Sequence, residues 1–234
     1  MNKKDFILSL FFPKRCKFCE KVIDYREHIC KECEESLPII EGDVCSKCGC
    51  EKAFCNCGEK SRYYMSVCAP YYYSGPPREA IKHLKFRNAK HLADGLADDM
   101  VSCFNERYKD LEFDFCTFVP AHKSTIKMRG YNQAELLCRS FSEKTGIPFS
   151  DLLQKDFKTP SQHTLNESTR KGNLLGAFSL RHKMKESIRD ARILLCDDIK
   201  TTGSTLDECA KTLLINGAAE VRCITLCVTK NDKK

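Results

Sequence analysis

Residues 193–206 read ILLCDDIKTTGSTL, and the order of residue types in this stretch decides the fold around it. The apolar run at 193–196 predicts a buried strand, and Asp197 and Asp198 stand at its end. A loop of small polar residues follows, and a helical pattern with Leu206 on its apolar face begins behind the loop. This order forms an anion site, because free backbone N–H groups and the positive end of the helix dipole point at one place.

The two adjacent carboxylates restrict the kind of anion that fits. Carboxylates repel phosphate, but they accept hydrogen bonds from sugar hydroxyls and bind metal ions. A helix that is merely capped needs neither two aspartates nor a glycine inside the loop. The nucleotide pattern G-x-x-x-x-G-K-[ST] and the dinucleotide pattern G-x-G-x-x-G are both absent from the sequence. The stretch therefore predicts a site for a phosphorylated sugar.

Hydrophobic residues followed by DD and TTGST resemble the motif that binds phosphoribosyl pyrophosphate (PRPP) in type I phosphoribosyltransferases. The resemblance implies that Asp197 and Asp198 contact the ribose hydroxyls and take part in catalysis. It also implies that the loop holds the 5′-phosphate through five residues, which are Thr201, Thr202, Gly203, Ser204 and Thr205.

A second strand and loop precede this motif. Residues 113–120 predict a buried strand, and residues 121–132 predict a polar loop before a helix that starts at Gln133. In type I phosphoribosyltransferases the loop after such a strand contacts the pyrophosphate of PRPP. A cation and Mg²⁺ near that group stabilise its departure. The resemblance implies that role for His122, Lys123, Arg129 and Gly130, with Arg129 also catalytic.

Cysteines are concentrated near the N-terminus, where nine of the seventeen precede Gly58. An odd total arranged in C-x-x-C pairs indicates metal thiolates in a reducing cytosol rather than disulfides. Four soft ligands at about 2.3 Å satisfy a tetrahedral zinc ion. We expect one or two such ions. The predicted ligands are Cys16, Cys19, Cys30 and Cys33 for the first and Cys45, Cys48, Cys55 and Cys57 for the second, with Cys50 as an alternative ligand.

These patterns divide the chain into two parts. We expect residues 1–60 to form a short N-terminal helix and a double zinc ribbon, and residues 61–234 to form a phosphoribosyltransferase-like domain. Closed four-cysteine sites are normally structural, so we expect structural zinc; a ribbon that grips nucleic acid or a partner protein is the alternative. The apolar run at 6–12 is too short to cross a bilayer and lacks a cleavage site, so we expect no membrane insertion and a cytoplasmic protein.

Several longer segments are similar to the ComF-type competence proteins, which pair a double zinc ribbon with a phosphoribosyltransferase domain. The similar segments are FFPKRCKFC at 11–19, YSGPPREAIKHLKF at 73–86, VPAHKSTIKMRGYNQAELL at 119–137 and QHTLNESTRKGNLLGAF at 162–178. They cover most of the chain in matching order. The resemblance implies an α/β protein with the type I phosphoribosyltransferase fold, a mostly parallel sheet flanked by helices, behind a small zinc-ribbon module.

A further segment, residues 152–166, begins like a strand and becomes polar. Type I enzymes close a flexible loop over the active site to exclude water, and this segment is the candidate for that loop. Gln162, Arg170 and Asn173 match positions characteristic of the ComF family. For Arg170, a contact with phosphate and an ion pair with Glu167 both remain open.

The net charge of +7 lies entirely in residues 61–234, because residues 1–60 hold eleven basic and eleven acidic side chains. A polyphosphate ligand, nucleic acid and simple solubility all suit such a surplus. One basic group lies on the helix predicted over 78–87 and just beyond it, and we interpret it as a solvated helix surface. It comprises Lys82, Lys85, Arg87 and Lys90.

Three functions follow. The first is a PRPP-binding ComF protein that acts in competence and DNA uptake, with single-stranded DNA and other DNA-uptake proteins as partners. The second is an active Mg²⁺-dependent transferase that moves phosphoribose from PRPP to a nitrogen acceptor in nucleotide metabolism or salvage. The third is a regulator that senses PRPP without turnover. The resemblance implies the first function, and no acceptor pocket can be read from the sequence to establish the second.

Overall fold

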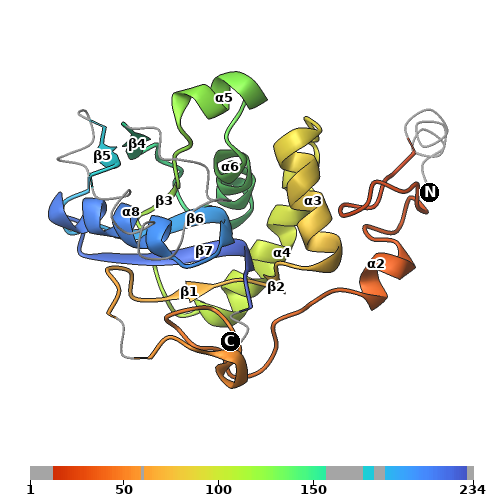
Figure 1. Ribbon diagram of the computed structural model, residues 1–234, viewed down its shortest axis with the longest axis horizontal. Coiled ribbons are helices and arrows are strands. Elements are labelled where there is room, and N and C mark those ends of the chain that lie inside the picture. The colour runs from red at the N-terminus through yellow and green to blue at the C-terminus, as the bar shows by residue number, and fades with distance from the viewer. Residues whose placement is uncertain (1–12, 59–60, 157–175, 182–187, 231–234) are drawn as a thin grey trace.

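A parallel sheet of five strands forms the centre of the protein. The computed structural model describes residues 13–58, 61–156, 176–181 and 188–230. The strands run in the order β1-β7-β6-β3, and β2 also pairs with β7 (Figure 1). Their bounds are β1 Val67–Cys68, β2 Tyr71–Tyr72, β3 Phe115–Phe118, β6 Arg192–Lys200 and β7 Glu220–Val228. The predicted mostly parallel sheet is confirmed.

The two longest strands of the described chain, β6 and β7, are neighbours. Ile193 pairs with Val221 and Asp197 pairs with Thr225 in a parallel register. Parallel strands need a crossover connection, and α8 (Ser204–Ile215) supplies it. Because both strands point the same way, Asp197 and the end of β7 emerge at the same edge of the sheet.

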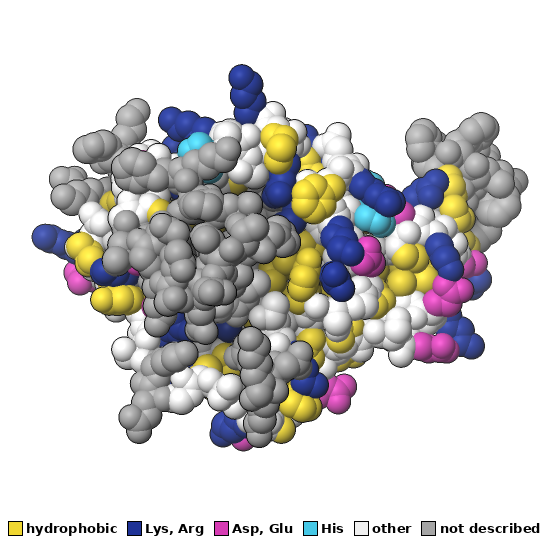
Figure 2. Space-filling model, in the orientation of Figure 1, with side chains coloured by type: hydrophobic (Ala, Val, Ile, Leu, Met, Phe, Trp, Pro, Cys, Tyr) yellow, Lys and Arg dark blue, Asp and Glu magenta, His cyan; other side chains and the backbone are white. Residues whose placement is uncertain are grey.

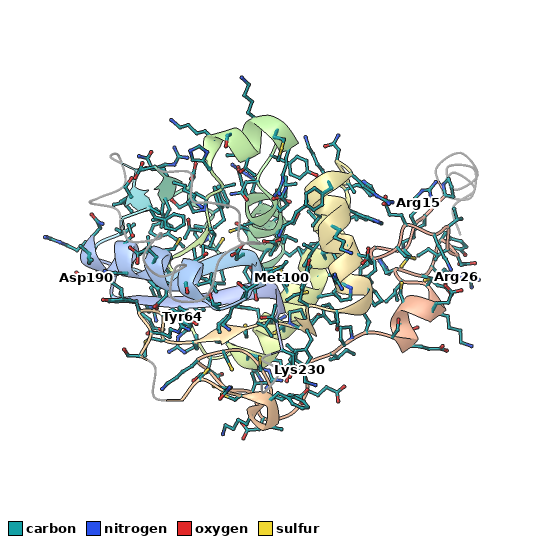
Figure 3. The ribbon with its side chains drawn as sticks, in the orientation of Figure 1. Arg15, Arg26, Tyr64, Met100, Asp190 and Lys230 are labelled. Atoms are coloured by element: carbon teal, nitrogen blue, oxygen red, sulfur yellow. The ribbon has the colours of Figure 1, made fainter. Side chains whose placement is uncertain are left out.

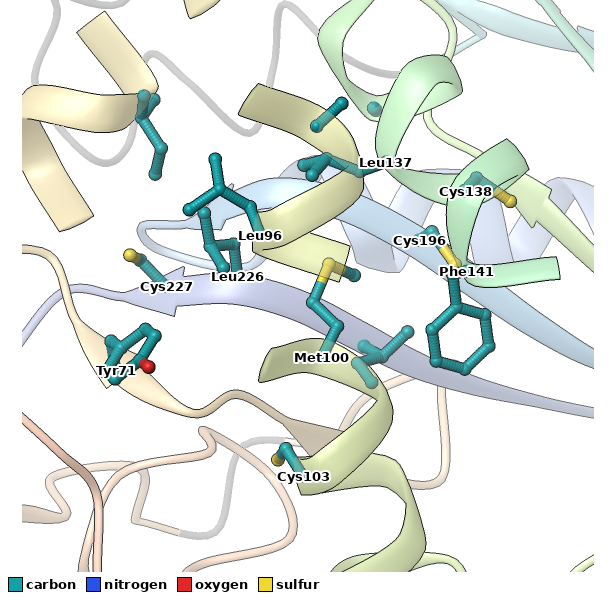
Figure 4. Close-up of a cluster of buried hydrophobic side chains, with 14 of the residues drawn as sticks. Tyr71, Leu96, Met100, Cys103, Leu137, Cys138, Phe141, Cys196, Leu226 and Cys227 are labelled. Carbon is teal, nitrogen blue, oxygen red and sulfur yellow. The ribbon is translucent and has the colours of Figure 1, made fainter. Parts of the chain in front are cut away.

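Helices cover both faces of the sheet. One face carries α4 (Leu92–Arg107) and α6 (Gln133–Thr145), and α3 (Gly75–Phe86) lies beside α4 (Figure 1). Figure 4 shows how Met100, Phe141 and Leu226 meet in the core between these helices and β7. The opposite face is covered by α8, which buries Leu206 and Leu213 against side chains on that face of β6 and β7, such as Ile193 and Val221.

A proline interrupts one edge of the sheet. β1 and β2 are separate strands, because Pro70 between them has no N–H to donate to the ladder. The loop predicted over 121–132 is wrong in part, since α5 (Lys123–Arg129) lies within it. The His122 side chain accepts from the N–H of Ser124 at 3.1 Å, and Gly130 ends the helix with a φ of 81°.

A small antiparallel pair stands apart from the main sheet. It consists of β4 (Leu153–Lys155) and β5 (Phe178–Leu180), and β5 was not predicted. The chain between them falls outside the described ranges, as do Gln162, Arg170 and Asn173 and the helix expected over 6–12. Their predicted roles stay predictions.

The described part of the N-terminal segment contains α2 (Lys31–Glu35) and a short 3₁₀ helix, η1 (Lys52–Phe54). It packs against the rest of the chain: Lys17 pairs with Asp99 of α4 at 2.5 Å, and the ring of Phe18 lies 5.8 Å from that of Tyr71. Within the described ranges, no helix is both long and apolar enough to cross a membrane.

Candidate functional site

The acidic pair lies at the carboxyl end of β6, the edge where ligands bind in parallel sheets. The backbone N–H of Asp198 donates to Asp197 Oδ1 at 2.8 Å, which fixes the first carboxylate. Burial, together with repulsion from the Asp198 carboxylate, raises the pKa of Asp197 well above its usual range. A hydroxyl donor or a cation that reached Asp197 would relieve this unfavourable charge.

A lysine from a distant helix completes the acidic pair. Lys85 of α3 forms an ion pair with Asp198, and the two side chains are 23% and 12% exposed. Burial lowers the pKa of Lys85, but the attraction of Asp198 outweighs it and the net shift is upward. The interpretation of Lys85 as part of a solvated surface is therefore wrong, whereas Lys82 does lie at the surface and pairs with Glu79.

The loop after β6 curls around the N-terminus of α8. Gly203 stands immediately before the helix with a φ of 80°, a conformation that suits glycine. The hydroxyls of Thr202 and Ser204 lie 3.0 Å apart and bond to each other. The first turn of α8 therefore presents its N–H groups beside the acidic pair, as an anion site requires.

A cavity of about 220 Å³ joins the acidic pair to this loop. From the predicted set, its walls contain Asp197, Asp198, Thr201, Gly203 and Thr205; Thr202 and Ser204 belong to the loop but are not among its lining residues. Lys85 and Lys155 also line it, and neither was predicted as a site residue.

Lys155 enters the cavity from β4 and lies 5.4 Å from the ring centre of Phe178. Its burial lowers its pKa. The sequence signal for Lys155 is its place in the strand-like beginning of the flexible-loop candidate, residues 152–166, which does not single it out.

The second predicted loop lies near the site, but its cations do not line the described walls of the cavity. Val119, at the end of β3, does line it. Arg129 donates to the side-chain oxygen of Gln133 at 3.1 Å and lies over the ring of Phe86 at 5.1 Å. His122 caps α5. Pyrophosphate contacts by His122, Lys123, Arg129 and Gly130 therefore stay a prediction.

The cysteines of the N-terminal segment form two groups of four, which we call the first and second tetrads. In each group the four Sγ atoms lie within 4.8 Å of one another. The first tetrad is Cys16, Cys19, Cys30 and Cys33, and the second is Cys45, Cys48, Cys55 and Cys57. Four thiolates so close together fit a structural zinc ion. Cys50 stands outside the second tetrad, where its thiol donates to the carbonyl of Thr229 at 3.6 Å.

Comparison with known proteins finds two domain families. The double zinc ribbon domain matches residues 7–69, and the phosphoribosyl transferase domain matches residues 124–234. Competence protein F of Haemophilus influenzae is 30% identical, over 82% of this chain and 93% of its own length. Competence protein ComFC of Bacillus subtilis is 28% identical, over 86% of this chain and 84% of its own.

A third relative, DNA utilization protein YhgH of Salmonella typhimurium, is 28% identical over 92% of this chain and 90% of its own length. These alignments run through both parts of the chain, and both matched families agree with the cysteine tetrads and the parallel sheet described above. The chain belongs to the ComF family of competence proteins, with a double zinc ribbon followed by a phosphoribosyl transferase domain.

Proposed function

We propose that this protein binds PRPP between the acidic pair and the loop at the start of α8, and that it acts in competence and DNA uptake. One observation carries the binding proposal: Asp197, Asp198 and the helix N-terminus share a single cavity. The names of the relatives, which refer to competence and DNA utilization, support the cellular role.

Different residues of the cavity bind different groups of the ligand. Loop N–H groups at the start of α8 bind the 5′-phosphate, and the ribose hydroxyls donate to Asp197 and Asp198. Lys85 and Lys155 supply two positive charges against a ligand that carries several negative ones. Mg²⁺, bound with PRPP, would neutralise further charge on the pyrophosphate.

Isothermal titration calorimetry with PRPP and Mg²⁺ tests the binding site. The double variant Asp197→Asn with Asp198→Asn should lose PRPP binding while its thermal unfolding stays cooperative. Asp114→Asn is the matched control, because Asp114 accepts from Arg192 at the opposite end of β6. Unchanged affinity in the double variant would rule out the ribose role.

Turnover is a separate question from binding. Pyrophosphate release from PRPP and Mg²⁺ should be measured against bases, amines and single-stranded DNA. Release with one acceptor identifies a transferase, in which Arg129 and the flexible-loop residues become the catalytic candidates. Binding without release under any of these conditions supports a PRPP sensor.

A surface beside the cavity favours single-stranded DNA as a partner. Phe86 at the end of α3 is 69% exposed and Met128 of α5 is 73% exposed. Arg129 lies over Phe86, and Lys90 lies 4.9 Å from the ring centre of Tyr131. Figure 2 shows basic and apolar side chains together at the top of the view, over α5 and the end of α3. Tyr131 itself is buried, so Phe86 is the ring that can stack on a base, and the neighbouring cations suit the phosphates.

Fluorescence anisotropy with a labelled thymidine oligonucleotide tests this surface. Phe86→Ala should weaken binding by about 1–3 kcal/mol, the range for loss of one stacked base. Ile215→Ala is the control, because Ile215 is 72% exposed but lies at the end of α8. Equal affinity in the two variants would exclude stacking on Phe86.

A further inference from the structure

The second tetrad is packed against the main sheet by the chain that follows it. Lys47 lies between two cysteines of this tetrad, and its carbonyl accepts a hydrogen bond from the Tyr64 hydroxyl at 2.9 Å. The backbone N–H of Val67 in β1 donates a second hydrogen bond to this segment, to the carbonyl of Ser46 at 2.8 Å. Figure 3 labels Tyr64 between the sheet and the N-terminal segment. The position of residues 62–67 is therefore tied to the second tetrad.

Tyr64 and its neighbours touch the loop of residues 201–205 directly, which we call the phosphate loop. A Cβ atom added to Gly203 would lie 2.9 Å from the Tyr64 hydroxyl oxygen and 3.2 Å from Cε of Lys200. Tyr64 itself is only 2% exposed, so it cannot easily move aside. The backbone of the loop is thus in close contact with a side chain that the second tetrad holds.

Arg62 joins the loop to the start of α8. Its guanidinium donates to the carbonyl of Thr202 at 2.8 Å and pairs with Asp207 at 3.6 Å. The N–H of Tyr63 also donates to Asp207 at 2.6 Å. Thr202 lies in the phosphate loop and Asp207 in the first turn of α8, so Arg62 fixes the two relative to each other.

A third connection runs along the end of the sheet. The Cys50 thiol donates to the backbone carbonyl of Thr229. The backbone N–H of Thr229 donates to the carbonyl of Lys200 at 2.9 Å. Lys200 is the last residue of β6, where the loop begins. Both ends of the phosphate loop are therefore in contact with residues around the second tetrad.

We propose that Arg62 is a positioning residue of the phosphate site, and that the second tetrad sets the affinity of the loop by holding Arg62 and Tyr64 in place. This inference rests on the proposed binding of a phosphorylated sugar. A loop that binds phosphate through backbone N–H groups gains affinity when it is ordered before the ligand arrives. The first tetrad does not adjoin the phosphate loop in this way. The chain around it contacts α3, α4 and the N-cap of α4 through ion pairs of Lys17 and Glu20.

Calorimetry with ribose 5-phosphate tests the role of Arg62. Arg62→Ala should weaken binding about tenfold, because a hydrogen bond from a charged donor orders the loop. Arg62→Lys keeps the charge and reaches one of the two partners, so it should restore part of the affinity. Arg139→Ala is the control, because Arg139 pairs with Glu135 on α6 at 2.9 Å and lies over Phe149, so its contacts are outside residues 62–67.

A second arm tests the tetrad. Cys45→Ser with Cys48→Ser should weaken ribose 5-phosphate binding about tenfold or more, and adding Arg62→Ala should weaken it no further, because both changes act through the same contact. The same pair of changes at Cys16 and Cys19 should weaken binding by less. If the second-tetrad variant does not fold, Tyr64→Phe tests the coupling, because it removes the hydrogen bond to the Lys47 carbonyl, and unchanged binding in that variant would refute it.

The outcomes separate this inference from the proposed function. Wild-type protein that binds neither ribose 5-phosphate nor PRPP would refute the proposed function itself. Wild-type binding that Arg62→Ala leaves unchanged, or that Arg62→Lys fails to restore, would refute the role of Arg62 alone. Equal losses from the two tetrads would refute the coupling to the second tetrad.

Discussion

The ion pair between Lys85 and Asp198 yields a prediction about stability. In the Lys85→Met variant the side chain keeps its length, but the cation that faces Asp198 is removed. Asp198 is 12% exposed and lies beside Asp197, whose pKa burial and repulsion already raise. The variant therefore leaves two neighbouring carboxylates without the cation from α3.

The size of the effect follows from the burial of the pair. Removing one partner of a buried ion pair costs about 3–5 kcal/mol. Lys85 is 23% exposed, and solvent screening reduces the cost to about 2–3 kcal/mol. In a chain of this length each kcal/mol lowers the melting temperature by about 2–4 °C, so we expect a decrease of about 4–12 °C at neutral pH.

Thermal unfolding followed by circular dichroism measures this decrease. Lys82→Met is the matched control on the same helix, because Lys82 pairs with Glu79 at the surface and its loss should cost within about 0.5 kcal/mol. Asp198→Asn and the double variant complete a cycle whose coupling energy isolates the pair. Equal stability of the Lys85→Met and Lys82→Met variants, or a coupling energy near zero, would show that the pair does not stabilise the fold.

Three further predictions concern pH, zinc and the phosphate loop. Folding raises the pKa of the Asp197 carboxyl above its value of about 3.9 in the unfolded chain. The stability that this group contributes is therefore fully present below about pH 3.9 and is lost as the pH rises through the pKa of the folded protein. Asp197→Asn should therefore gain stability over wild type between pH 4 and 7 in urea unfolding, and a constant difference would contradict this. Chelation of zinc should unfold residues 14–58, because each site contributes roughly 10–16 kcal/mol, and native resistance to limited proteolysis would refute it. Gly203→Ala should destabilise the protein by about 1–3 kcal/mol more than Gly146→Ala. Both glycines have a positive φ, but of the two only Gly203 has another atom within 4 Å of the new methyl group. Equal stabilities of the two variants would exclude the contact with Tyr64.

The part of the site around β6 could be predicted because its information is local. Strand, acidic pair, loop and helix follow one another within residues 193–206, and the apolar residues of α8 and β7 recur at the spacing of their elements. Parallel pairing of β6 and β7 then follows from the helix between them. The cysteine tetrads are local in the same way, because C-x-x-C turns supply ligands in pairs.

Other features depend on how distant elements pack, and no local pattern encodes them. Lys85 shares its helix with Lys82, whose side chain is 40% exposed, and differs from it because α3 is placed so that Lys85 faces Asp198 of β6. Arg62 lies in no motif of its own and gains its partners, Thr202 and Asp207, from a part of the chain about 140 residues away. α5 was missed because its cap is a histidine, which is not among the usual capping residues.

The N-terminal segment and α3 both contribute residues to the proposed phosphate site. Lys85 supplies a positive charge to the cavity, while Arg62 and Tyr64 hold the phosphate loop from the other side. None of the three lies within residues 124–234, the part that matches the phosphoribosyl transferase domain. Loss of zinc would therefore affect more than the ribbons, because the free energy of metal binding also stabilises the contacts that order the loop. We therefore expect the affinity for a phosphorylated ligand to depend on residues on both sides of the domain boundary.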